Sequence, residues 1–332
     1  MNDLSQLICQ ITGAQSLEFG ERIQTLWSGY GVIQRAALKG VQPEAVVVKH
    51  VDISKVRSNR RGWGGDVSHQ RKVRSYQVEK EFYESYANQC NDACRVPKLV
   101  VAHEKEDHGG WLIILEDLDA AGFDQRKQSV SKNDIHSCLA WLANFHATFM
   151  NCDGHGLWPI GTYWHLATRQ EELIAMSPSP LKQAASQIDD RLNQSKYQTL
   201  VHGDAKLANF CFGKRGATQK GVGNVSAVDF QYVGRGCGMK DVAYFISSCL
   251  DDEQTGAQQD SLLNYYFATL QESFSSRQIA IDFDDLESQW RELYPFAWAD
   301  FCRFLSGWSP GHWKLNQYND RITNSVLKSL GY

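Results

Sequence analysis

Short apolar runs separated by glycines and polar residues characterise the first 117 residues of the chain. Residues 45–49 (AVVVK) and 111–115 (WLIIL) are the clearest examples, and their β-branched and aliphatic side chains predict buried strands. Before them, residues 2–13 have an amphipathic pattern that predicts a short helix. We therefore expect a small, mainly β N-terminal region that ends near residue 117.

Helical periodicity replaces this pattern in the larger remainder, residues 118–332. Residues 131–150 repeat apolar side chains three and four positions apart, and Ser131 is a possible N-cap. Shorter helical patterns at 169–176 and 181–192 are separated by the turn-forming sequence Ser-Pro-Ser-Pro. The second part of the chain is therefore predicted to be mainly helical.

The C-terminal part is rich in aromatic residues. They are Trp290, Tyr294, Phe296, Trp298, Phe301, Phe304, Trp308 and Trp313. One interpretation is an aromatic cage for a quaternary ammonium group such as that of choline. We favour a second interpretation, because Trp298, Phe301, Leu305 and Trp308 have the spacing of a buried stripe on a helix whose first turn contains Pro295.

Charge and cysteine content narrow the function classes. A formal net charge of −4 gives no general attraction to nucleic acid or to an anionic membrane. The N-terminus lacks the basic start and apolar core of a signal peptide, and the longest apolar run, 111–115, is too short to span a bilayer. We expect a cytoplasmic protein with no nucleic-acid or membrane partner. Nine cysteines without a C-x2-C pair predict free thiols.

Residues 200–244 contain most of the candidate catalytic and metal-binding residues. This stretch contains His202-Gly203-Asp204, then Asn209, and Asp229-Phe230-Gln231 after a predicted hairpin. The turn of this hairpin is the glycine-rich segment 213–224, which lies between two apolar runs. Asp204, Asn209 and Asp229 can therefore converge at the end of one small antiparallel ribbon.

Phosphoryl transfer from ATP needs such a set. One carboxylate, Asp204, would orient the acceptor hydroxyl and take its proton, while Asn209 and Asp229 would hold the Mg²⁺ that neutralises the phosphates. Asp and Asn are also five positions apart in the protein-kinase catalytic loop. Gly203 and Gln231 replace the Arg and Gly of that family's motifs. The alternative is that the three residues are turn residues bonding their own backbone.

The combination HGD-x4-N, DFQ and DVAYF resembles the aminoglycoside phosphotransferase and choline kinase superfamily, and it is most similar to the ecdysteroid kinase-like branch. The resemblance implies a bilobal, protein-kinase-like α+β fold with lobes at 1–117 and 118–332. It also implies ATP and Mg²⁺ as cofactors and a hydroxylated small molecule as the acceptor. That branch often has Trp at the position of Lys206. Protein kinases have a lysine near the γ-phosphate there, so Lys206 is a candidate catalytic residue, and a solvent-facing lysine is the alternative.

The nucleotide side of this site is expected in the N-terminal region. Glycines in the turn Ser28-Gly29-Tyr30-Gly31 would let backbone N–H groups approach phosphates, although such a turn alone is more often a plain hairpin. The following strand resembles the V-A-I-K strand of kinases, so Lys49 would reach the α- and β-phosphates.

A glutamate on the next helix should hold this lysine, and we favour Glu81 over Glu79. By resemblance, the peptide groups of Glu116 and Leu118 would contact adenine. Between the lysine strand and the helix, the basic stretch 52–75 suggests a flap beside the active site, with a solvated loop as the alternative.

Three rival functions are weighed against a small-molecule kinase. A nucleic-acid-binding module that uses the basic stretch is disfavoured because the overall charge of the chain is negative. A protein Ser/Thr kinase is disfavoured, because only residues 232–240 separate the DFQ motif from a helix opened by Asp241, and no A-P-E motif follows. A non-catalytic nucleotide-binding scaffold is disfavoured because every expected catalytic position is occupied. Acidic groups at 251–253 and 282–287 favour a cationic acceptor, whereas the basic stretch favours an anionic one.

Overall fold

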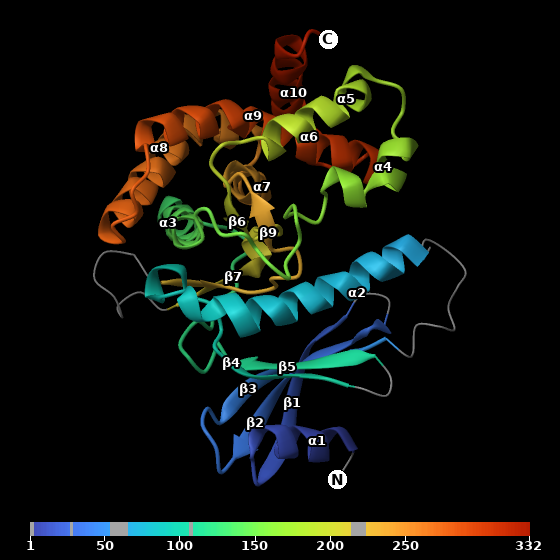
Figure 1. Ribbon diagram of the computed structural model, residues 1–332, viewed down its shortest axis with the longest axis vertical. Coiled ribbons are helices and arrows are strands. Elements are labelled where there is room, and N and C mark those ends of the chain that lie inside the picture. Colours follow the sequence, from blue (N-terminus) through green and yellow to red (C-terminus); the bar gives the residue numbers. More distant parts are fainter. Residues whose placement is uncertain (1–2, 27–28, 54–65, 106–108, 214–223) are drawn as a thin grey trace.

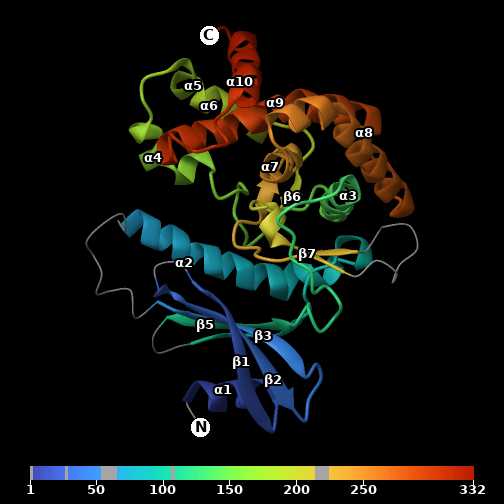
Figure 2. The same cartoon turned by 180° about the vertical axis from the view of Figure 1, so that it is seen from behind.

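The structure is a computed structural model that describes residues 3–26, 29–53, 66–105, 109–213 and 224–332. A five-stranded sheet with one helix on its outer face forms the first lobe, and a helical assembly forms the second (Figure 1). Both views show helix α2 (Asp66–Glu81) lying lengthwise between the two (Figure 2). The predicted two-lobed α+β organisation is confirmed.

The first lobe is an antiparallel sheet with the strand order β1-β2-β3-β5-β4. Its strands are β1 (Ser16–Thr25), β2 (Gly31–Lys39), β3 (Ala45–Asp52), β4 (Leu99–Glu104) and β5 (Gly110–Glu116). Alternation along β3 directs Val46 and Val48 to one face, where they pack with Ile8 of α1 (Asp3–Thr12). The opposite face carries Lys49 toward α2.

Helix α2 begins at Asp66, inside the stretch 52–75 that was expected to form a basic flap. Residues 54–65 of that stretch lie outside the described residues. The flap prediction is wrong from Asp66 onward. The helix continues into a single π-turn, η3 (Phe82–Tyr86), followed by two short 3₁₀ turns, η4 (Ala87–Gln89) and η5 (Asp92–Cys94).

The basic residues of α2 explain why a charged sequence forms a helix here. Arg71 Nη1 donates a hydrogen bond to the carbonyl of Thr168 at 2.6 Å, and Arg74 Nη2 donates to the carbonyl of Gly156 at 2.9 Å. Both acceptors belong to the second lobe. These arginines connect the lobes, and only tertiary structure supplies the partners that make the segment helical.

The second lobe contains eight α-helices among the described residues. They are α3 (Lys132–Thr148), α4 (Gln170–Ala175), α5 (Pro180–Gln183), α6 (Ala185–Asn193), α7 (Met239–Cys249), α8 (Asp252–Ser276), α9 (Phe283–Trp308) and α10 (Gln317–Ser329). Its short strands and turns are η6 (Leu166–Thr168), β6 (Thr199–Val201), η7 (Leu207–Asn209), β7 (Phe210–Phe212), β8 (Val225–Ala227) and β9 (Gly234–Gly236). Strand β7 pairs with β8 as the predicted hairpin, and β6 pairs with β9.

Helix α3 is the central element of this lobe. Its start is a capping box, in which Ser131 Oγ accepts from the Asp134 amide at 3.3 Å and Asp134 Oδ2 accepts from the Ser131 amide at 2.9 Å. Such a cap stabilises a helix by about 1 kcal/mol. The predicted N-cap is therefore confirmed. Trp141 and Phe145 on the buried face stack on each other and reach Phe230, which follows the motif residue Asp229.

Helix α9 differs from the prediction. It does not start at Pro295; it starts twelve positions earlier, at Phe283, where the Asp282 side chain caps it. The proline is accommodated inside the helix. Trp298, Phe301 and Leu305 are only 4%, 5% and 1% exposed, which confirms the core interpretation for these three residues. It is wrong for Trp308, which lies at the end of the helix and is 49% exposed.

The structure can be compared with the expectations about membrane spans, cysteines and the boundary between the lobes. Within the described ranges, no helix combines the length and the apolar character needed to cross a membrane. All nine cysteines lie in those ranges and are free thiols. Strand β5 ends at Glu116, and we retain the division of the lobes at residues 117 and 118 as a proposal.

Candidate active site

The loop after β6 carries Asp204, and hydrogen bonds to α7 hold this loop in place. Asp241, in the first turn of α7, accepts hydrogen bonds from the amides of His202 at 2.6 Å and Gly203 at 2.9 Å. Gly203 has φ +79°, and a Cβ there would lie 2.1 Å from the carbonyl oxygen of Tyr232. Only glycine fits this position. Asp241 therefore braces the loop.

His202 supports the same loop from the side. Its Nδ1 accepts a hydrogen bond from the Asp204 amide at 3.2 Å, and its Nε2 donates to the carbonyl of Val228 at 3.1 Å. One ring nitrogen accepting and the other donating describes a neutral imidazole. His202 thus ties the loop to the segment that leads into Asp229, and it does not face the reacting groups.

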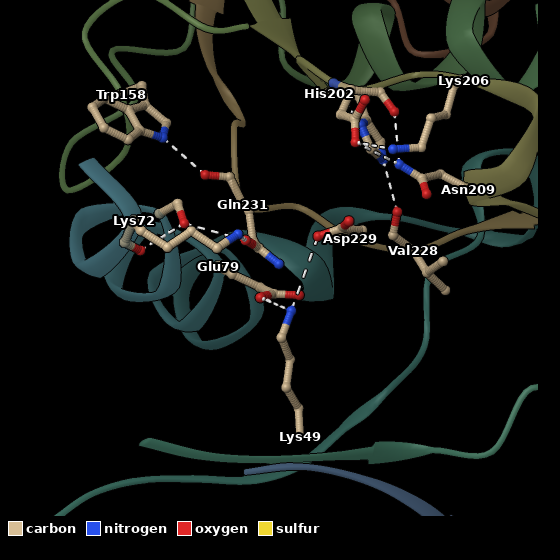
Figure 3. Close-up of polar contacts among 12 residues, drawn as sticks. Lys49, Lys72, Glu79, Trp158, His202, Lys206, Asn209, Val228, Asp229 and Gln231 are labelled. Carbon is tan, nitrogen blue, oxygen red and sulfur yellow. Dashed lines mark hydrogen bonds and ion pairs between the residues drawn. The ribbon is translucent and has the colours of Figure 1, made fainter. Parts of the chain in front are cut away.

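Asp204 is buried and surrounded by donors, two of which, Lys206 and Asn209, lie side by side in Figure 3. Lys206 Nζ lies 2.8 Å from its Oδ2, and Tyr244 Oη donates to its Oδ1 at 3.2 Å. Asn209 Nδ2 donates to its carbonyl at 2.8 Å and its Oδ2 at 3.1 Å. Burial raises the pKa of Asp204, although the charge of Lys206 opposes this shift. The arrangement favours a carboxylate that can take up a proton.

Asp229 follows β8 with φ +72°, a left-handed conformation that Asp tolerates better than most residues. The next residue, Phe230, fixes this turn by stacking on Phe82, with ring centroids 3.9 Å apart. The Asp229 side chain is 36% exposed, and its Oδ1 lies 4.0 Å from Lys49 Nζ. Burial works to raise its pKa, but the charges of Lys49 and Lys72 hold the pKa of Asp229 below its usual value.

The oxygen atoms of Asp229 and Asn209 fit a magnesium site. Asp229 Oδ1 has no hydrogen-bond partner within the described part of the chain. The amide nitrogen of Asn209 is turned toward Asp204, which leaves its Oδ1 directed elsewhere. Carboxylate and amide oxygens are the ligands that Mg²⁺ prefers. The unsatisfied Asp229 oxygen is the structural feature that this ion would explain.

Lys49 is held by Glu79 rather than by Glu81. Lys49 Nζ lies 2.5 Å from Glu79 Oε2, and the two side chains are only 5% and 3% exposed. Burial raises the pKa of Glu79 against the opposing charge of Lys49. Glu81 instead accepts a hydrogen bond from Ser85 Oγ at 2.7 Å. The assignment of Glu81 is wrong because two residues correspond to about 200° around a helix, which moves its side chain off the face directed at the sheet.

The glycine turn between β1 and β2 is partly described. Gly29 has φ +77° and Gly31 has φ +144°, and a Cβ on Gly31 would lie 1.9 Å from the carbonyl oxygen of His50. Tyr30 is buried, and its hydroxyl is 2.7 Å from His69 Nδ1. Its side chain is therefore part of the core, and only its backbone can face a ligand. Ser28 lies outside the described residues.

Residues 116–118, which were expected to contact adenine, form the hinge that connects β5 to the second lobe. The Glu116 amide donates to the Lys98 carbonyl at 2.9 Å, and the Leu118 carbonyl accepts from the Phe123 amide at 2.8 Å. These two groups are already bonded within the protein. The Glu116 carbonyl and the Leu118 amide remain our predicted contacts for adenine. Arg35 of β2 forms ion pairs with Asp117, at 2.5 Å, and with Asp119, which attach the hinge to the sheet.

Comparison with known proteins decides the family. Residues 64–155 and 162–278, together more than half of the chain, match the ecdysteroid kinase-like family. The chain belongs to this family. No curated protein matches it.

Several solved structures are similar to this ecdysteroid kinase-like protein. A complex of the amicoumacin kinase hAmiN with AMP-PNP, Ca²⁺ and Ami matches with a TM-score of 0.53 and 11% identity, over 99% of this chain and 93% of that chain. A microcompartment-associated aminopropanol kinase has a TM-score of 0.49 and 11% identity, over 97% and 94%. A GDP complex of aminoglycoside 2′-phosphotransferase-IIIa has a TM-score of 0.49 and 12% identity, over 99% and 100%. The likeness to the amicoumacin kinase shows a kinase-like fold.

Sequence reasoning missed two polar residues of the ecdysteroid kinase-like site. Tyr244 contacts Asp204, and its position three residues after Asp241 on α7 could have indicated this side of the helix. Lys72 was assigned to the flap, but it lies on α2 and donates to Gln231 Oε1 at 2.7 Å. Lys72 is seven positions before Glu79, a spacing that returns to the same helix face. That spacing was a usable signal once the segment was known to be helical.

Proposed function

We propose that the chain is an ATP- and Mg²⁺-dependent phosphotransferase that moves the γ-phosphate to a hydroxyl of a small molecule. The observation that carries this proposal is the convergence of Asp204, Asn209 and Asp229, with the Lys49–Glu79 ion pair facing Asp229. The acceptor oxygen would bond to the γ-phosphorus while the bond to the β,γ-bridging oxygen breaks. The acceptor proton would pass to Asp204.

The remaining roles follow from position and charge. Asn209 and Asp229 would hold Mg²⁺, which supplies neutralisation of phosphate charge when bound. Lys49 would bind the α- and β-phosphates, and its ion pair with Glu79 keeps the ammonium group in place. The backbone of Gly29 to Gly31 would cover the phosphates, and the Glu116 and Leu118 peptide groups would contact adenine.

Two observations disfavour the rival functions. In the short segment between the DFQ motif and α7, residues 234–236 form strand β9, which leaves little chain for the peptide platform of a protein kinase. Arg71 and Arg74 of the basic stretch bond backbone carbonyls of the second lobe, so they are engaged within the protein and are poorly suited to nucleic acid.

The groups near Asp204 favour a neutral or anionic acceptor. The Asp251 and Asp282 side chains, from the two acidic segments, cap helices α8 and α9. On the Asp204 side, Lys206 is joined by Lys314, whose Nζ lies 5.0 Å from the ring of Tyr244. Burial lowers the pKa of Lys314 to about 8.

The function is tested by measuring ADP release with a panel of hydroxylated acceptors. The panel contains amino alcohols, aminoglycosides, sugars, sterols and hydroxy acids, each assayed with Mg-ATP and with Asp204→Ala as the control. We expect at least one acceptor to stimulate ADP release by the wild-type protein only. The proposal fails if no acceptor does so and calorimetry detects no binding of Mg-ATP.

Replacing Lys206 with alanine should lower kcat by ~10²-fold, or about 3 kcal/mol, with little change in the KM for ATP. The ammonium group lies beside Asp204 and remains 40% exposed, so it can meet the transferring phosphoryl group as charge develops on it. Steady-state kinetics with an acceptor from the panel measure the effect. Lys206→Arg should retain most of the activity. An unchanged kcat for Lys206→Ala would leave this lysine without a catalytic role.

The matched pair Glu79→Gln and Glu81→Gln should separate the two candidate glutamates. Glu79→Gln leaves Lys49 buried without its anionic partner, so we expect the Kd for Mg-ATP to rise ~10-fold or more. Glu81→Gln removes the negative charge but keeps an oxygen that can accept from Ser85 Oγ, so it should change Kd less than ~2-fold. Titration calorimetry on both variants measures this. A larger effect at Glu81 would contradict the assignment.

A further inference from the structure

Helix α2 carries a lysine, Lys72, that the mechanism above does not use. Lys72 Nζ donates to Gln231 Oε1 at 2.7 Å (Figure 3). Ser75 Oγ lies 3.2 Å from the same oxygen and 2.7 Å from the Lys72 carbonyl, so these two acceptors share its one proton. Gln231 is 5% exposed, and its backbone carbonyl accepts from Trp158 Nε1 at 2.8 Å. Gln231, whose side-chain amide holds Lys72, is therefore itself held by Ser75 of α2 and by Trp158 of the second lobe.

The charge of Lys72 lacks a carboxylate partner. Across the parts of the chain that the structure describes, Lys72 forms no ion pair, and its second contact is the face of the Tyr76 ring, 4.8 Å from the ring centroid. Burial lowers the pKa of Lys72 to about 8. Asp229 and Glu79 attract this cation from a distance, but its direct contacts are an amide and a ring. A partly desolvated cation without a paired anion is costly in free energy. This arrangement is typical of an anion-binding site.

The position of Lys72 indicates which anion it binds. Lys49 Nζ lies 5.6 Å from the centroid of the same Tyr76 ring, so one aromatic side chain contacts both ammonium groups. Lys49 Nζ also lies 4.0 Å from Asp229 Oδ1. Lys72 is therefore next to the lysine that faces the carboxylate expected to bridge metal and phosphates.

We propose that Lys72 is a second phosphate-binding cation for the nucleotide and that Gln231 is the residue that positions it. The proposal rests on the proposed function and extends it to the third residue of the DFQ motif. A glycine at that position, as in protein kinases, would have no side chain to hold Lys72. When the nucleotide binds, the ammonium group would contact the β- or γ-phosphate. The negative charge of that phosphate would take the place of the missing carboxylate.

The test compares ligands that share the base and differ in phosphate number. The Kd values of ATP, ADP and adenosine are measured for the wild-type protein and for Lys72→Met, with adenosine determined by competition. We expect Lys72→Met to weaken ATP binding at least ~10-fold and to leave adenosine within ~2-fold. Lys72→Arg should restore most of the ATP affinity. Gln231→Met should give a smaller loss, also confined to the phosphorylated ligands.

Arg74→Met is the matched control, because it removes a cation from the same helix. Arg74 donates to backbone carbonyls of Gly156 and Leu157 and connects the lobes. Its replacement should change ATP and adenosine binding by the same factor. An equal loss of both ligands in Lys72→Met would make Lys72 another connection between the lobes, and an unchanged ATP affinity would give it no role; either result overturns the proposal. A wild-type protein that binds no ATP would instead refute the proposed function.

Discussion

Replacing Asp229 with alanine should abolish the contribution of Mg²⁺ to ATP binding and reduce turnover by at least ~10³-fold. Its Oδ1 has no hydrogen-bond partner in the described residues, and the neighbouring lysines keep the carboxylate ionised. Such a group is ready to ligate a cation. Alanine removes the ligand and leaves Lys49 paired with Glu79 alone.

Calorimetry of ATP binding with Mg²⁺ and with EDTA measures the effect directly. The wild-type protein should bind more tightly with Mg²⁺, whereas Asp229→Ala should give the same Kd under both conditions. Asp285→Ala is a suitable control, because that carboxylate pairs with Lys196 in an exposed position remote from the DFQ motif. A variant at Asp229 that keeps the full Mg²⁺ effect would remove this residue from the metal site.

The part of the site that could be predicted from sequence is the part built by local chain geometry. Asp204 and Asn209 lie five positions apart, and a single hairpin of short strands brings Asp229 back to them. The apolar run at residues 45–49 likewise identified the strand that carries Lys49. In each case the relevant contacts are formed within one or two neighbouring elements, so spacing along the chain determines proximity in space.

The parts that could not be predicted depend on packing between elements that are distant in the sequence. The choice between Glu79 and Glu81 depends on the rotation of α2 about its axis. Packing of Tyr76 against Trp111 of the sheet and of Phe82 against Phe230 determines that rotation. The early residues of α2 are charged and have no apolar periodicity of their own, so they resemble a loop until their partners in the second lobe are known.

The roles of Lys72 and Gln231 illustrate the same limit on local reasoning. They are separated by 159 positions in the chain, and each is unremarkable alone. A lysine in a basic stretch predicts a solvated surface, and a glutamine beside a metal-binding motif predicts little. Their hydrogen bond becomes visible only when α2 lies across the second lobe (Figures 1 and 3). The departure of the DFQ motif from Asp-Phe-Gly then acquires a structural explanation.

Replacing Asp204 with asparagine should lower kcat by ~10³-fold and change the Kd for Mg-ATP less than ~3-fold. Asparagine keeps the size of the side chain and can still accept from Lys206 or Tyr244, so the loop should remain in place. It cannot take the acceptor proton. Burial raises the pKa of Asp204, which brings the carboxylate closer to the proton affinity that this transfer needs.

Kinetics with an acceptor from the panel, together with calorimetry, separate the proton-accepting role from a structural one. Tyr244→Phe is the matched control, because it removes only the hydroxyl that donates to Asp204 Oδ1 at 3.2 Å. We expect that variant to lose less than ~10-fold in kcat, since one neutral hydrogen bond contributes about 1 kcal/mol. If Asp204→Asn lost no more activity than Tyr244→Phe, proton transfer to Asp204 would not limit the reaction. The acceptor would then have to lose its proton to solvent or to the phosphate itself.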